Sequence, residues 1–232
     1  VHVAGAAKGS GMIHPNMATM LGYLTTDAAV APGVLQALLS AVTDETFNMI
    51  TVDGDTSTND MVVAMASGLA GNRPLDPAHP EWEKFAAAFR YVAETLAKAI
   101  ARDGEGATKL IEVNVTGAAG VEDARAIART IAGSNLVKAA VYGSDANWGR
   151  VIAAAGRAGR AMNPDTVDIR IGDIFVLRKS APVAFDEAAA KAYLDGDTVA
   201  IHVDLGIGDG RATAWGCDLT YDYVKINASY RT

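Results

Sequence analysis

The stretch HPNMATMLG, residues 14–22, contains the side chain with the clearest chemical potential in the sequence. Thr19 follows a small residue, Ala18, and comes shortly after a Pro-Asn turn. A threonine hydroxyl is a weak nucleophile unless a base is held beside it, and a threonine that begins a chain can use its own α-amine as that base. The amine has a pKa of about 7.7–8.0, so a useful fraction is neutral near pH 7. Cutting the Ala18–Thr19 peptide bond would therefore turn Thr19 into a nucleophile.

The same threonine has an ordinary interpretation. Threonine is common in β-strands, where its branched side chain fits the pleated surface, and Thr19 stands directly before the apolar run at 20–28. Self-cleavage needs room for the hydroxyl to attack the preceding carbonyl, and the small Ala18 leaves that room. On the local sequence alone, a strand residue remains the stronger interpretation.

Four further polar residues stand out, and each also has an ordinary interpretation. Lys8 lies among small residues and glycines, where it is either a solvated loop lysine or a ligand for an anionic group. Glu105 directly follows a long predicted helix, whose dipole disfavours a carboxylate at that end, so a cationic group such as a substrate ammonium or Arg102 is its candidate partner. Asn227 and Thr232 lie in the last six residues, where chain ends commonly fray. None of the four is strong evidence by itself.

Other well-known site signatures are missing from the sequence. Neither KGSGM nor GEGATK has the glycine and lysine order of a phosphate-binding loop. DGDTSTND lacks the glycine and the glutamate that complete a calcium loop. The histidines show no metal-ligand spacing, no GxSxG motif occurs, and the single cysteine, Cys217, has no CxxC partner. We therefore predict no metal site.

Composition narrows the function classes. The 232 residues are 50% hydrophobic and 20% charged, as expected of a globular protein that buries a core without disulfides. A net charge of −7 without any basic run argues against nucleic-acid binding. No apolar stretch reaches the ~18 residues of a membrane span, and no secretory signal opens the chain. The opening VHVAGAAKGSGM resembles the interior of a domain, so we expect a segment upstream of it.

The elements that must position these residues are helices and strands mixed along the whole chain. Helices are predicted at 31–50, 61–69, 81–103, 121–133, 147–159 and 186–194. Strands are predicted at 20–28, 109–117, 135–143, 198–206 and 211–228, with a short strand and polar loop at 50–60 and a hairpin at 166–180. The clearest helix, 81–103, carries one apolar stripe. The pattern predicts an α/β or α+β class, with a candidate boundary that divides the chain into residues 1–108 and 109–232.

Several ordered motifs together resemble one family, the ornithine acetyltransferases, also called the bifunctional glutamate N-acetyltransferases of arginine biosynthesis. The resemblance rests on KGSGMIHPNMATML, TTDA, TVDGDTSTND, RDGEGATK, YGSDANWGR and the ending CDLTYDYVKINASYRT. These motifs are long, keep one order and span essentially the whole chain. They therefore favour the nucleophile interpretation of Thr19 over the strand interpretation.

The resemblance implies a fold, a maturation step and a set of site residues. Family members are layered α/β sandwiches of the self-cleaving N-terminal-nucleophile type, with a smaller C-terminal α/β subdomain. Their precursors cut themselves before the threonine, here between Ala18 and Thr19, and the two chains assemble as an α2β2 heterotetramer. The chain resembles the end of the α chain followed by the β chain, so the missing α-chain segment is an expected partner. The substrate-binding positions match Lys8, Thr19, Glu105, Asn227 and Thr232.

The implied reaction is a ping-pong acyl transfer. Thr19 would take the acetyl group of N2-acetyl-L-ornithine and pass it to L-glutamate. No cofactor is implied, and acetyl-CoA is an additional acetyl donor only in the bifunctional members. The family's oxyanion-hole pair lies upstream of these motifs, so no residue of this chain is assigned to it. We expect a cytoplasmic location, or the mitochondrial matrix if the chain is fungal.

Two alternatives stay open. A hydrolase on the same scaffold, an aminopeptidase or amidase, would pass the acyl group to water instead of an amine. A non-catalytic fragment or assembly partner is the other, because only eighteen residues precede Thr19 here, whereas family precursors carry a long segment there.

Overall fold

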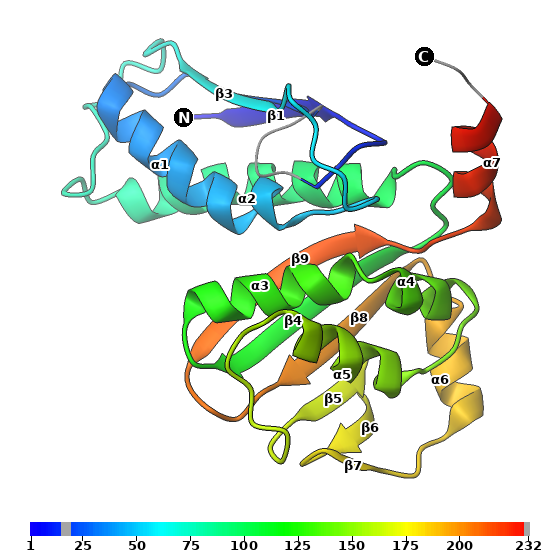
Figure 1. Ribbon diagram of the computed structural model, residues 1–232. Helices are drawn as coiled ribbons and strands as arrows, with labels where there is room; N and C mark the ends of the chain where they lie inside the picture. The colour runs from blue at the N-terminus through cyan, green and yellow to red at the C-terminus, as the bar shows by residue number, and fades with distance from the viewer. Residues whose placement is uncertain (15–19, 230–232) are drawn as a thin grey trace.

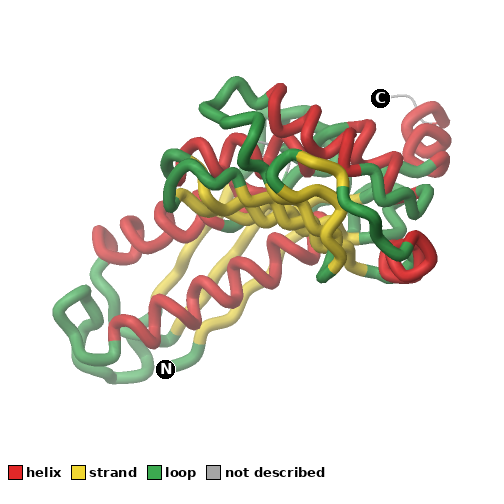
Figure 2. The backbone as a smooth tube through the Cα atoms, turned by 90° about the horizontal axis from the view of Figure 1, so that it is seen from below, coloured by secondary structure: helices red, strands yellow, loops and turns green. Residues whose placement is uncertain are grey.

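The computed structural model of the chain describes residues 1–14 and 20–229. These residues form two β-sheets with helices between and beside them (Figures 1 and 2). The helices are α1 Pro32–Glu45, α2 Trp82–Arg102, α3 Val121–Ala132, α4 Asn135–Tyr142, α5 Trp148–Arg157, α6 Glu187–Leu194 and α7 Tyr221–Ser229, with a short 3-10 turn at Phe47–Met49. The strands are β1 Val3–Lys8, β2 Leu21–Thr26, β3 Met61–Ala66, β4 Leu110–Ala118, β5 Asp168–Ile171, β6 Ile174–Arg178, β7 Ala181–Pro182, β8 Thr198–Asp204 and β9 Gly210–Cys217. The expected mixed α/β class is confirmed.

The smaller sheet has the strand order β1-β2-β3. β2 runs antiparallel to β1 and parallel to β3, and α1 makes the crossover that a parallel pair requires. Leu24 and Thr26 of β2 are buried on the face that α2 covers. The opposite face leaves large side chains exposed, namely Tyr23, Met61 and Met65. An apolar sheet face of this kind is a surface for further packing.

The larger sheet has the strand order β7-β6-β5-β8-β4-β9. β4 lies next to the edge strand β9, and it pairs parallel with β8 and antiparallel with β9. Ile111, Val113 and Val115 are buried, which confirms the inward alternation predicted for this strand. α3 packs on β4 and β9, and α5 packs on α3 (Figure 1). The hydrophobic core of this half therefore lies between the sheet and these two helices.

Helix α2 connects the two sheets. It contacts β1 and β2 of the small sheet and β4 and β9 of the large one (Figure 1). The predicted apolar stripe is confirmed, with Phe85, Phe89 and Ile100 buried along it. No helix within the described ranges is long and apolar enough to cross a membrane.

Two predicted elements have the wrong type. Residues 61–69 were expected to be helical, but β3 forms there beside β2. Residues 135–143 were expected to be a strand, but α4 forms there and buries Val137 and Val141 one helical turn apart. Short apolar runs fit either a buried strand or a buried helix, and only the neighbouring elements decide between them.

The strand predicted at residues 211–228 is correct in its first half and wrong in its second half. β9 ends at Cys217, and the expected continuation of the strand is the helix α7 instead. The hydroxyl of Thr220 accepts a hydrogen bond from the backbone N–H of Tyr223 at 3.2 Å, as a helix-capping side chain does. None of the residues of α7 is buried, so no apolar periodicity announces this helix. The division at residues 108 and 109 stays a prediction.

Candidate active site

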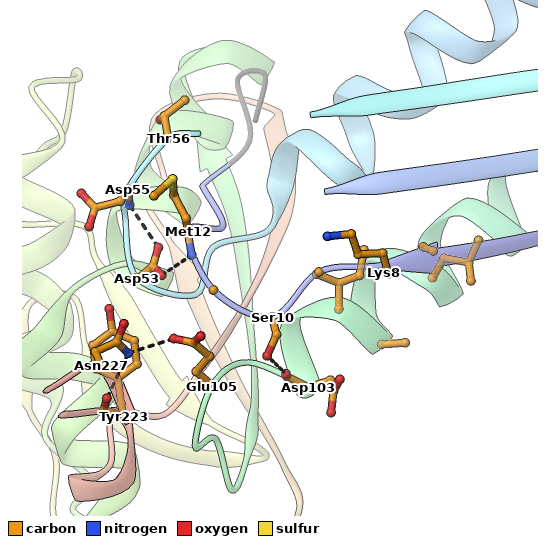
Figure 3. A pocket seen from close by; sticks show the side chains of 16 residues that line it. Lys8, Ser10, Met12, Asp53, Asp55, Thr56, Asp103, Glu105, Tyr223 and Asn227 are labelled. Atoms are coloured by element: carbon orange, nitrogen blue, oxygen red, sulfur yellow. Dashed lines mark hydrogen bonds between the residues drawn. The ribbon is translucent and has the colours of Figure 1, made fainter. Parts of the chain in front are cut away.

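A cavity of about 1060 Å³ opens where the end of β1, the C-terminal end of α2 and the helix α7 meet (Figure 3). Its polar and charged lining residues are Lys8, Ser10, Asp53, Asp55, Thr56, Asp103, Glu105, Tyr223 and Asn227. Segments from both ends of the chain and from its middle therefore contribute to one hollow.

Three of the residues singled out in the sequence line this cavity. They are Lys8, Glu105 and Asn227. The expected nucleophile Thr19, the expected cleavage position Ala18–Thr19 and the expected substrate-binding residue Thr232 lie outside the described residues. Their roles stay predictions.

Glu105 and Asn227 contact each other although 122 positions separate them in the sequence. The side-chain amide of Asn227 donates to Oε2 of Glu105 at 2.8 Å and to the carbonyl oxygen of Tyr223 at 3.0 Å. The carboxylate is therefore held by a neutral donor, and its negative charge is not cancelled by this contact.

The backbone after α2 allows this close approach. Gly106 has φ +68°, in the left-handed region that favours glycine. A Cβ atom there would lie 2.7 Å from the backbone nitrogen of Tyr223. Gly106 thus lets the first turn of α7 sit directly against the loop that carries Glu105.

The segment after β1 clamps the same loop from the other side. The backbone N–H of Glu105 donates to the carbonyl oxygen of Ser10 at 3.1 Å, and the hydroxyl of Ser10 donates to the carbonyl oxygen of Asp103 at 2.9 Å. A Cβ atom on Gly11 would lie 2.6 Å from the carboxyl carbon of Glu105. The carboxyl group of Glu105 therefore occupies space that a side chain at position 11 would fill.

Lys8 ends β1 and is paired in register with Leu21, the first residue of β2. Its exposed side chain lies on one side of Ser10, while Glu105 and Asn227 lie on the other (Figure 3). Strand pairing thus fixes a cation beside the chain segment that follows Thr19.

The charges of the cavity are mostly unpaired. Within the part of the chain that the structure describes, Lys8 and the carboxylates Asp53, Asp55, Asp103 and Glu105 form no ion pair. A hollow with one cation and several carboxylates suits a small molecule that carries both a carboxylate and an ammonium group. Among the described residues, no group of His, Cys, Asp and Glu side chains forms a candidate metal site.

His14 is the last described residue before position 20 and is half-buried. Burial lowers the pKa of His14, and the positive charge of Arg129 lowers it further, against the opposing charges of Asp53 and Asp55. Its imidazole is therefore neutral near pH 7. Nδ1 lies 2.9 Å from the hydroxyl oxygen of Thr51, which is hydrogen-bonding distance.

Sequence reasoning missed several residues that build this site. Ser10 and Asp103 act through their backbone or through contacts to backbone, and no residue type announces such contacts. Asp53 opens the motif DGDTSTND, which lacks the pattern of a calcium loop, whereas its carboxylate accepts hydrogen bonds from the N–H groups of Met12 and Ile13. The three aspartates in the polar loop at residues 50–60 are the sequence signal that could have indicated a role for this loop.

Comparison with known proteins gives a consistent result. The model of the ArgJ family matches residues 1–232. The chain is 66% identical over 232 residues to the arginine biosynthesis bifunctional protein ArgJ of Geobacillus stearothermophilus, which covers 100% of this chain and 57% of the relative. The protein of the same name from Halalkalibacterium halodurans is 63% identical over 233 residues, again with 57% of the relative covered. The chain thus spans little more than half the length of these relatives.

A solved structure is similar over most of the chain. The crystal structure of the arginine biosynthesis bifunctional protein ArgJ from Bacillus halodurans superposes with a TM-score of 0.90 at 60% sequence identity. The match covers 91% of this chain and 100% of the solved one. This agreement confirms the layered α/β fold that the motif resemblance implied.

Proposed function

This chain belongs to the ArgJ family, and on that premise we propose that it forms part of an acetyltransferase of arginine biosynthesis. The complete protein would move the acetyl group of N2-acetyl-L-ornithine to L-glutamate through Thr19. The observation that carries the proposal is the cavity that gathers Lys8, Glu105 and Asn227 beside the segment leading to Thr19.

The first proposed step frees the nucleophile. The hydroxyl oxygen of Thr19 attacks the carbonyl carbon of Ala18, the C–N bond breaks, and an ester replaces the peptide bond. Water then hydrolyses the ester, which leaves a carboxylate on Ala18 and a free amine and hydroxyl on Thr19. The chain before the cut and the chain after it would stay associated through the pairing of β1 with β2.

The transfer itself would need only groups of the protein and the two substrates. The hydroxyl of Thr19 attacks the acetyl carbonyl, its proton passes through the α-amine to the departing amine of ornithine, and an acetyl ester remains. The α-amine of L-glutamate then attacks the ester and returns a proton to the threonine oxygen. Oxyanion donors would come from outside this chain.

The charges of the cavity suit the proposed donor substrate. N2-acetyl-L-ornithine carries one carboxylate and one ammonium group. Lys8 would pair with the carboxylate, and Glu105, oriented by Asn227, would accept the ammonium. Thr232 is proposed as a further contact on the motif resemblance alone.

The partner segment and the assembly are also proposals. The exposed sheet face around Tyr23, Met61 and Met65 is a suitable surface for the remaining part of a full-length family member. The match to the solved relative covers the whole of that solved chain and 91% of this chain. The same chain covers only 57% of the curated relative from Halalkalibacterium halodurans. This difference in length supports the proposal that family members are divided into two polypeptides. An α2β2 heterotetramer and a cytoplasmic location follow from the resemblance.

The relatives are named as bifunctional proteins. We propose acetyl-CoA as the second acetyl donor, without any bound cofactor. Transfer of label from acetyl-CoA to glutamate by the purified protein tests this point separately.

Product analysis tests the proposed function. The full-length protein is incubated with N2-acetyl-L-ornithine, with and without L-glutamate, and acetate and N-acetylglutamate are quantified. The proposal predicts N-acetylglutamate only when glutamate is present, and no turnover or cleavage with Thr19→Ala. Acetate released at the same rate without glutamate would identify a hydrolase instead.

A further inference from the structure

The aspartate Asp53 has no role in the proposed acetyl transfer, yet its carboxylate makes two short contacts beside the cavity. Oδ2 accepts a hydrogen bond from the backbone N–H of Met12 at 2.6 Å, and Oδ1 accepts one from the N–H of Ile13 at 3.0 Å. A carboxylate that accepts backbone N–H groups makes stronger hydrogen bonds than a neutral acceptor. Asp53 therefore fixes two consecutive peptide units shortly before the Ala18–Thr19 bond.

The same polar loop also holds the chain after that bond. A carboxylate oxygen of Asp60 accepts a hydrogen bond from the backbone N–H of Met20. The carbonyl oxygen of Met20 accepts from the N–H of Met61 at 2.9 Å, at the start of β3. Two aspartates seven positions apart thus hold the two flanks of residues 15–19.

Further bonds tie the first flank to the loop. The backbone N–H of Val52 donates to the carbonyl oxygen of Ile13 at 2.7 Å. The hydroxyl of Thr56 donates to the carbonyl oxygen of His14 at 3.2 Å. Residues 12–14 are therefore bonded to the loop through both their N–H groups and their carbonyl groups.

The loop is itself anchored from the core. Lys138, only 2% exposed, donates from Nζ to the carbonyl oxygens of Val52 and Cys217, each at 2.6 Å. A buried ammonium that lost such partners would be strongly unfavourable, so the loop cannot shift away from it easily. The residue before Asp53 is thereby fixed to the large-sheet half of the molecule.

We propose that Asp53 is a positioning residue for self-cleavage between Ala18 and Thr19, with Asp60 serving the opposite flank. This role rests on the proposed function. Cleavage requires the hydroxyl to approach the preceding carbonyl in one narrow geometry, and intramolecular reactions of this kind are accelerated when the freedom of the reacting groups is restricted beforehand. The hydrogen bonds of Asp53 to residues 12 and 13 and of Asp60 to residue 20 would supply this restriction from the two flanks.

The chain offers a matched control for Asp53. The carboxylate of Asp27 also holds the N-terminal segment, since Oδ1 accepts from the N–H of His2 at 2.6 Å and Oδ2 lies 2.7 Å from Nδ1 of His2. It does so at the end of β1 opposite to Lys8. Loss of Asp27 loosens the same strand without touching residues 12–14.

The experiment follows cleavage in a chain of the relatives' full length. Wild type, Asp53→Asn, Asp53→Ala, Asp27→Asn and Asp27→Ala are made by cell-free translation with a labelled pulse, and the uncut precursor is quantified over time. Each variant is also prepared with Thr19→Ala, which blocks cleavage, so that thermal midpoints are compared between uncut chains.

We expect cleavage to slow at least about tenfold in Asp53→Ala, the effect of losing hydrogen bonds to a charged group. Asp53→Asn should be intermediate, because its amide keeps one acceptor oxygen. The Asp27 variants should be cut at the wild-type rate. The order of the cleavage rates among these variants should be the same at temperatures well below the thermal midpoint of every variant.

Four outcomes would overturn the proposal. Wild-type cleavage in Asp53→Ala removes the role directly. Equal slowing by the Asp27 variants, or slowing that disappears at temperatures further below the midpoint, means that general anchoring matters and local positioning does not. A wild-type chain that stays uncut refutes the proposed maturation itself, and with it this role. Failure of the role of Asp53 alone leaves cleavage of the wild-type chain intact, so the two failures are distinguishable.

Discussion

Helix α2 separates two polar cavities that use the same residue types differently. Ala99 and Asp103 border the candidate active site, whereas Arg90, Glu94 and Lys98 border a second cavity of about 490 Å³. An α-helix turns about 100° per residue, so these two sets of side chains point to opposite sides of α2.

Most charged side chains of the second cavity are paired, since Arg90 pairs with Glu45, and Lys98 pairs with Glu94 and Glu112. Nζ of Lys98 lies 2.8 Å from Oε1 of Glu94 and 3.2 Å from Oε2 of Glu112, and Nε1 of Trp215 donates to the same Oε2 at 2.8 Å. Burial by itself would raise the pKa of Glu112, but the hydrogen bonds from Trp215 and Asn114 and the charge of Lys98 outweigh it and leave the pKa lowered. Such a network stabilises the ionised forms.

Charged side chains of the candidate active site form no ion pair among the described residues. The comparison teaches that residue type alone does not separate a structural charge from one that awaits a ligand. What separates them is whether the fold itself provides the opposite charge. Replacing charges on the two sides of α2 should therefore affect different properties of the protein.

The largest effect is expected on the active-site side. Glu105→Gln and Lys8→Met should each lower kcat/KM for N2-acetyl-L-ornithine by about tenfold to a hundredfold, because each removes one charged contact to substrate. Thermal midpoints should stay near wild type, since no ion pair of the described fold is lost. Steady-state kinetics and a thermal scan check both points. An unchanged kcat/KM would place the substrate elsewhere.

On the other side of α2, Glu112→Ala should lower the free energy of unfolding by about 1–2 kcal/mol and leave KM unchanged, because Lys98 and Trp215 lose a charged partner. The folded pKa of Glu112 is lowered, so its contribution is present above the unfolded pKa of about 4.3 and is lost as pH falls through the folded value. Urea unfolding of wild type and variant at neutral and acidic pH measures this. A raised KM would show that the two sides are coupled.

A smaller effect sharpens the role of Glu105. Gly11→Ala should raise KM about fivefold with little change in kcat, because the added methyl group displaces the carboxylate at a cost of about 1 kcal/mol. Glu105→Asp in the same chain shortens the side chain and should recover part of the loss. If the double variant is worse than both single ones, the steric explanation is wrong.

The smallest effect concerns the pH dependence of stability. The pKa of His14 in the folded chain is lowered, chiefly by burial. Near and below about pH 6.5, the unfolded chain therefore binds more protons than the folded chain, and the free energy of unfolding decreases as the pH is lowered, until the pH passes the folded pKa. His14→Gln should reduce this slope between about pH 7.5 and 5.5. Burial also lowers the pKa of His202, so His202→Gln is the matched comparison. Urea unfolding across this range gives the slopes, and an unaltered slope for His14→Gln would contradict the assignment.

The sequence predicted the elements that have a clear apolar period, such as the long helix α2 and the alternating strand β4. The motif resemblance singled out Lys8, Glu105 and Asn227, which line one cavity in the structure, and their roles stay predictions. The sequence did not predict α7, because an exposed helix has no buried stripe. Asp53 was missed because its partner Met12 lies 41 positions away and uses only its backbone.

The most direct measurement is an intact-mass spectrum of the denatured protein after incubation with N2-acetyl-L-ornithine alone. Acetyl transfer through Thr19 predicts a chain that begins at this residue and carries one added acetyl group on it, which disappears when L-glutamate is added. An uncut chain, or an acetyl group carried by another residue, would contradict it.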